Sequence, residues 1–102
     1  LRPGGVLLNF DADYGTADFT SFAAERGQHA HAGLDSALLW EGESIRRQLP
    51  LSCEQRPEWD AEVLRQVGFS SVAVDTGISG RVYAVRDASY NPVPMFALRA
   101  VK

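Results

Sequence analysis

The hydrophobic and polar positions of the chain predict three β-strands. Residues 6–10 (VLLNF) form an apolar run of strand length that one asparagine interrupts. Residues 70–75 alternate between apolar and polar, with Val72 and Val74 on one face. Residues 95–101 (MFALRAV) are apolar on both faces, and such a strand is usually covered on both sides. We therefore expect the last strand to lie inside a sheet, with other elements packed above and below it.

The stretch between the first two strands has the spacing of helices. Residues 20–49 are mostly helix-compatible, and glycines within them favour two or three short helices over one long helix. Residues 81–86 are a further β-prone stretch, which we interpret as a strand extension or a short irregular piece.

Residues 57–67 carry the clearest helix signal. Pro57 suits a first helical turn, and Glu58 and Asp60 are acidic residues where the helix dipole favours them. Gly68 follows as a residue that can end the helix in the left-handed conformation. One apolar stripe runs along this helix and is expected to pack in the core: Trp59, Val63, Leu64 and Val67.

The composition describes one small globular domain. The chain has 102 residues, of which 45% are hydrophobic and 23% charged, and it contains no apolar run of membrane-spanning length. The net charge of -3 gives no broad basic field, so neither nucleic acid nor a membrane is an expected partner. The single cysteine, Cys53, fits a reducing compartment, and we expect a cytoplasmic protein.

The residues before the first strand, LRPGG, form a turn that normally joins two elements. Pro3 disfavours helix at the residue before it, and Gly4 and Gly5 permit the positive φ angles of a tight turn. Because no element precedes this turn, we expect the chain to be a segment of a larger fold.

Three motifs stand in an order that a known family shares. LRPGG precedes an apolar strand, WDAEVLRQVGF forms a helix with a Gly-Phe exit, and MFALRAVK closes the chain. In this order they resemble the carboxyl-terminal half of a class I S-adenosylmethionine-dependent methyltransferase domain. The resemblance implies an α/β fold: a three-stranded mixed sheet flank, corresponding to the fifth, seventh and sixth strands of a Rossmann-like sheet, with helices on its faces. It also implies that residues 95–101 run antiparallel between the other two strands.

The same resemblance implies a function. The parent protein would move a methyl group from S-adenosylmethionine to a small molecule, and residues 1–102 would form much of the acceptor side. The chain has no glycine-rich turn between a strand and a helix, so we expect no donor-binding residues and no activity in the chain alone. The alternatives are a stand-alone small α+β binding or interaction module and a regulatory domain with a ligand near Asp13, Tyr14 and His31.

The first strand is expected to be an edge of the sheet. The resemblance implies that the family's fourth strand would pair with residues 6–10, and the chain does not contain it. An apolar unpaired edge invites another chain. We therefore expect a homodimer in which this edge is covered by strand pairing across a two-fold axis or by exchange of an element.

Four residues are candidates for binding the acceptor: Asp13, Tyr14, His29 and His31. Asp13 and Tyr14 follow a strand end, at the rim where open α/β sheets place ligands, although acidic residues and glycine there can simply form a turn. His29 and His31 suit an acid or base because the ordinary pKa of histidine lies near neutrality; the alternative is a pair of exposed helical histidines.

Other polar residues give weaker signals. No third ligand stands at a diagnostic spacing from the histidines, so we expect no metal site, and we assign no catalytic residue. Arg46, Arg47 and Arg56 suit an anionic acceptor, but glutamates surround them, and a mixed solvated surface is the expected outcome.

Overall fold

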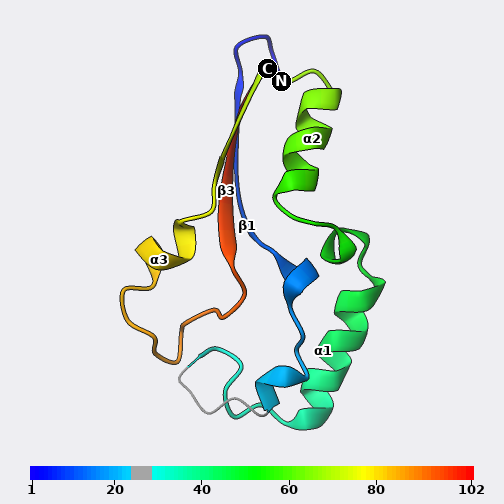
Figure 1. Cartoon of the computed structure of the whole chain (residues 1–102), viewed down its shortest axis with the longest axis vertical. Helices are drawn as coiled ribbons and strands as arrows, with labels where there is room; N and C mark the ends of the chain where they lie inside the picture. Colours follow the sequence, from blue (N-terminus) through cyan, green and yellow to red (C-terminus); the bar gives the residue numbers. More distant parts are fainter. Residues whose placement is uncertain (24–28) are drawn as a thin grey trace.

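The computed structural model describes residues 1–23 and 29–102 (Figure 1). Their elements follow the chain as β1 (Val6–Ala12), η1 (Tyr14–Thr16), η2 (Ser21–Ala23), α1 (Ser36–Gln48), η3 (Pro50–Cys53), α2 (Glu58–Gln66), β2 (Ser71–Asp75), α3 (Ile78–Val82) and β3 (Met95–Val101), where η denotes a short 3-10 helix. The three predicted strands and the helix after Pro57 are confirmed. None of the helices in the described ranges is long and apolar enough to cross a bilayer.

The strands form one sheet in the order β1-β3-β2, so the last strand lies in the middle as expected. β3 pairs antiparallel with β1, from Val6 opposite Val101 to Ala12 opposite Met95. It also pairs antiparallel with β2, from Ser71 opposite Val101. Because both adjacent pairs are antiparallel, the expected mixed sheet is wrong for the described residues. β1 and β2, each antiparallel to β3, point in the same direction.

α2 covers one face of this sheet. Phe96 and Leu98 of β3 are buried against Ala61 of α2, with Leu64 and Val72 beside them. Gly68 has φ +96° and ends the helix as predicted, and the N–H of Phe69 donates to the carbonyl of Leu64. The predicted stripe is only partly correct: Trp59 is 36% exposed and Val67 is 57% exposed.

The opposite face of the sheet is largely bare. Leu8 and Phe10 of β1 are 64% and 63% exposed, and Arg99 of β3 is also exposed. The expectation that β3 is covered on both faces is therefore wrong for the part of the chain that the structure describes. The overall dimensions of 48 × 32 × 17 Å agree with a sheet that carries one layer of helix.

A second core joins α1 to the end of the sheet. Ala12, Phe22, Leu39 and Val93 are buried together, with aromatic residues of the η1–η2 region packed around them. α1 begins at an N-cap, since the carboxylate of Asp35 accepts from the N–H of Ala37 at 2.7 Å. Residues 24–28, within the segment expected to form short helices, lie outside the described residues.

The chain turns into α3 instead of extending β2. The carboxylate of Asp75 accepts from the N–H of Gly77 at 2.9 Å and also binds the guanidinium of Arg81. These contacts fold residues 75–81 back on themselves, and α3 includes the first residues of the β-prone stretch. The strand-extension interpretation of residues 81–86 is therefore wrong.

Candidate functional site

The candidate site lies at the carboxyl end of β1, where η1 meets α1 and η3. Asp13 begins η1: its carboxylate accepts from the N–H of Gly15 at 3.1 Å, and its own N–H donates to the carbonyl of Pro94 at 2.8 Å. This is the turn-forming role named as the alternative for Asp13. Gly15 is required here because a Cβ on it would lie 2.5 Å from the carbonyl oxygen of Glu54 in the loop before α2.

Tyr14, His29 and His31 meet in one aromatic cluster, together with Phe19 and Phe22. The Tyr14 ring stacks on Phe19 with centroids 6.1 Å apart, and His31 meets Phe19 edge-on at 5.3 Å. His31 lies flat on Phe22, with centroids 5.0 Å apart and planes 2° from parallel. His29 lies 5.6 Å from Phe22. Three of the four predicted residues are thus brought together by two phenylalanines that the sequence analysis did not single out.

The histidines are not exposed helical residues. His29 is 5% exposed, and its Nδ1 accepts from the N–H of His31 at 3.1 Å. Burial lowers the pKa of His31, and the nearby His29 lowers it further. The imidazole of His31 is therefore neutral at pH 7 and has the protonation state that a general base needs.

Glu43 anchors the wall of α1 that faces this cluster. Its side chain is buried, and its carboxylate binds Arg46 at 2.7 Å and Arg47 at 2.7 Å. It also accepts from the N–H of Phe19 at 3.1 Å. The hydrogen bond from Arg46 is the main cause that lowers the pKa of Glu43 to about 2. The glutamate–arginine spacing of three and four residues on a predicted helix is a signal that could have identified these pairs.

Arg46 links that wall to η1. Its guanidinium donates to the carbonyl of Tyr14 at 3.0 Å and to the carbonyl of Ser52 at 3.3 Å. A hollow of about 190 Å³ between these elements is lined by Tyr14, Phe19, Ile45, Arg46, Leu49 and Ser52. Its walls are mostly apolar, so it suits a small apolar group rather than an anion.

Arg56 ties the same strand end to α2. It binds Asp11 at 2.8 Å and Asp60 at 2.7 Å, and its guanidinium lies 5.1 Å from the centre of the Phe96 ring. Arg56 is 7% exposed, and Asp60 and Asp11 hold its pKa above the ordinary value for arginine. The expected solvated surface is therefore wrong for Arg46 and Arg56 and correct for Arg47, whose side chain is 66% exposed.

Asp13 faces a different hollow from Tyr14. A space of about 410 Å³ is lined by Asp13, by Gly15 and Thr16 of η1, and by residues 53–56 and Glu58. Cys53 is exposed there. Asp13 therefore lies apart from the histidines. Among the four predicted residues, Tyr14, His29 and His31 belong to one cluster.

Metal and family assignments gain no support from the described residues. Among residues 1–23 and 29–102, no group of three histidine, cysteine or acidic side chains could hold a metal ion. Comparison with known proteins finds no matching family model and no significant match among curated proteins or solved structures.

Proposed function

We propose that this chain is the acceptor-side flank of an S-adenosylmethionine-dependent methyltransferase domain that acts on a small molecule. The observation that carries the proposal is the strand order β1-β3-β2, with the last strand antiparallel between two strands that point the same way. This order is the one that the sequence resemblance implies. A simple meander of consecutive strands would instead place β2 in the middle.

The bare side of the sheet supports the same proposal. A Rossmann-like sheet carries helices on both faces, whereas the described residues cover one face and leave Leu8 and Phe10 exposed on the other. Apolar strand faces are normally covered, so the missing layer belongs to a partner or to further chain.

The chain's part in the reaction is to bind the acceptor. Tyr14 and the apolar hollow beside it hold the acceptor. Neutral His31 does not line this hollow but packs edge-on against Phe19, one of its walls, and it is our candidate for taking up the proton that the acceptor releases on methylation. The late glycines do not support donor binding, because Gly77 caps and Gly80 lies within a helix of only five residues, whereas a donor-binding turn opens a long helix after a strand. The donor site therefore lies elsewhere in the parent protein.

The test is a calorimetric titration of S-adenosylmethionine into the full product of the gene that encodes this chain. We expect saturable binding to that product and none to the 102-residue chain, which serves as the control. A gene product that ends where this chain does, or a longer one that fails to bind the donor, would overturn the proposal in favour of a stand-alone binding module.

A further inference from the structure

The outer edge of β1 carries backbone groups that nothing in the described residues pairs. The N–H of Asp13 donates to Pro94, and the carbonyl of Gly5 accepts from Lys102, both across the ladder to β3. Because backbone groups alternate in direction along a strand, the odd-numbered residues of β1 face β3 and the even-numbered residues face outward. Asp11 satisfies the outward N–H of Ala12 at 2.8 Å. Val6, Leu8 and Phe10 are left with open donors and acceptors.

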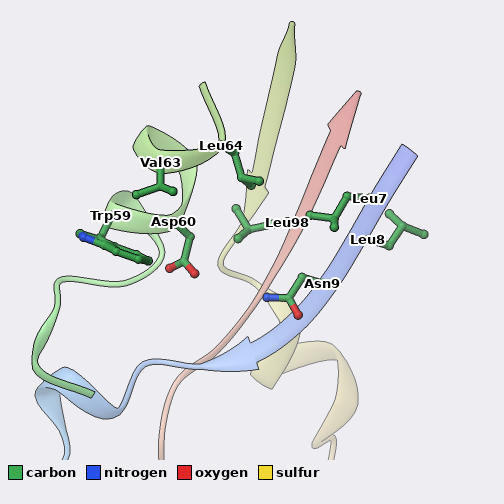
Figure 2. Close-up of a pocket in the computed structure, with 8 residues that line it drawn as sticks. All are labelled: Leu7, Leu8, Asn9, Trp59, Asp60, Val63, Leu64 and Leu98. Carbon is green, nitrogen blue, oxygen red and sulfur yellow. The ribbon is translucent and has the colours of Figure 1, made fainter. Parts of the chain in front are cut away.

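Both faces beside this edge are mostly apolar, although Asn9 and Asp60 contribute polar groups to one of them. Val6, Leu8 and Phe10 project onto the bare face and are 45%, 64% and 63% exposed. On the other face, a groove of about 290 Å³ runs between β1 and α2. Figure 2 shows this groove, with Leu7 facing it, Trp59 and Val63 on α2 along its other wall, and Leu8 pointing away. β1 carries no charge before Asp11, so this edge lacks the charged residues that normally block strand pairing.

We propose that a second copy of this chain pairs with the edge, β1 against β1, antiparallel about a two-fold axis at Leu8. In this register, Leu8 lies opposite the partner's Leu8, and Val6 lies opposite the partner's Phe10. Each outward N–H then meets an outward carbonyl of the other copy, because all of these residues are outward-facing. The two sheets become one continuous sheet with α2 of both copies on the same face.

The side chains favour a second copy in this register. Leu7 lies opposite the partner's Asn9 and enters the groove between the partner's β1 and α2. The two-fold axis repeats this contact, so each copy places its Leu7 in the groove of the other. Asp11 lies opposite the partner's Gly5, so no like charges meet. A shift of the axis to Asn9 would place Leu7 opposite the partner's Asp11 and would require the Ala12 N–H that Asp11 already binds.

The area sets the expected strength of the pair. The exposed parts of Val6, Leu8 and Phe10, with the groove walls, bury on the order of 1,000 Å² in total, the lower limit for a specific interface. The dimer should therefore be concentration-dependent. The proposal concerns the 102-residue chain, in which the outer edge of β1 is open. It does not rest on the proposed methyltransferase function, in which a further strand of the parent domain would cover this edge instead.

The first test is analytical ultracentrifugation of the 102-residue chain over a range of concentrations. We expect a monomer–dimer equilibrium, and Leu8→Lys, which places two ammonium groups at the axis, should weaken it at least tenfold. Val74→Lys is the matched control, because Val74 is an exposed valine on β2 away from this edge, and it should leave the equilibrium unchanged. A chain that stays monomeric at every concentration, with native circular dichroism, overturns the proposal.

The second test fixes the register by disulfide formation in a Cys53→Ser background. Leu8→Cys should cross-link two copies under mild oxidation, because directly opposed residues lie about 5.5 Å apart between Cα atoms. Phe10→Cys is equally exposed and should not cross-link, because four residues of strand, roughly 13 Å, separate it from the partner's Cys at the same position. Equal cross-linking of both variants, or of Phe10→Cys alone, contradicts this register. Donor binding by the full gene product is a separate measurement, so each proposal can fail without the other.

Discussion

The guanidinium of Arg56 binds the carboxylate of Asp11 at 2.8 Å and so fastens the loop before α2 to the end of β1. The same guanidinium binds Asp60 in the first turn of α2 and lies over the Phe96 ring of the central strand. One buried side chain therefore holds helix, sheet and candidate site in a fixed relation.

Removing Arg56 should destabilise the protein strongly. Arg56→Ala leaves two carboxylates facing each other without a cation, and we expect the free energy of unfolding to fall by about 3 kcal/mol. Arg65→Ala is the matched control, because the pair of Arg65 with Glu62 spans 4.0 Å at the surface, and it should cost less than about 0.5 kcal/mol. Urea unfolding measures both, and equal effects would show that Arg56 is not a buried anchor.

Glu43 should make stability depend on acid pH. Its pKa lies at about 2 in the folded protein against 4.5 without these contacts, so the folded state favours the ionised form. This contribution is fully present above about pH 5 and is lost as the pH falls toward 2, where the carboxylate takes up a proton. The free energy of unfolding should therefore fall over that range.

The variant Glu43→Gln removes this contribution. Its free energy of unfolding should change less between pH 5 and pH 2 than that of the unchanged protein, and it should be lower at pH 7. Glu41→Gln, at an exposed position two residues away on the same helix, should preserve the slope. Urea unfolding at a series of pH values gives both slopes. If the free energy of unfolding of Glu43→Gln fell with pH as steeply as that of the unchanged protein, carboxylates other than Glu43 would cause the pH dependence.

His31 should titrate below the ordinary value for histidine. Burial and the neighbouring His29 lower its pKa from 6.5, so the unfolded chain binds a proton more readily than the folded one. Acidification below pH 6.5 should therefore cost stability. An NMR titration of the ring Cε1–H signals measures the pKa directly, and Phe22→Ala, which removes the stacked ring, should raise it toward 6.5. A His31 pKa at or above 6.5 in the unchanged protein would show that the cluster is open to water.

Gly15 should tolerate no side chain. The added methyl group of Gly15→Ala would meet the carbonyl oxygen of Glu54, and the resulting shift of η1 should cost about 1–3 kcal/mol. Gly80→Ala meets no atom within 4 Å in α3 and should be neutral or stabilising by up to about 1 kcal/mol. Thermal unfolding compares the two, and a neutral Gly15→Ala would show that η1 and η3 do not approach this closely.

Local patterns predicted the elements that depend on neighbouring residues. The three strands, α2 and its end at Gly68 follow from spacing, dipole preference and backbone freedom, which act within a few residues. The central place of β3 came from the family resemblance. The apolar residues on both faces of β3 also indicated a central strand. They further implied a second covering layer, which the described residues do not provide.

The candidate site depends on contacts between residues far apart in the chain, and local patterns did not predict it. The glutamates near Arg46 and Arg56 in the sequence predict a solvated surface, whereas the partners of these arginines include the carbonyl of Tyr14 and the carboxylate of Asp11. The ring of His31 is surrounded by Phe19 and Phe22, which precede it in the chain by more than two helical turns. Residues 81–86 have β propensity, but the contacts of Asp75 turn the chain into α3 first.

Amide hydrogen exchange tests the central claim most directly: β3 lies between β1 and β2, and the outer edge of β1 is open. The experiment uses Leu8→Lys, which should be monomeric. We predict slow exchange at Asn9, whose N–H faces β3, and at Leu98 in the middle of the sheet, with fast exchange at Phe10. Protection of Phe10 equal to that of Asn9 in the monomer, or fast exchange at Leu98, would contradict this arrangement.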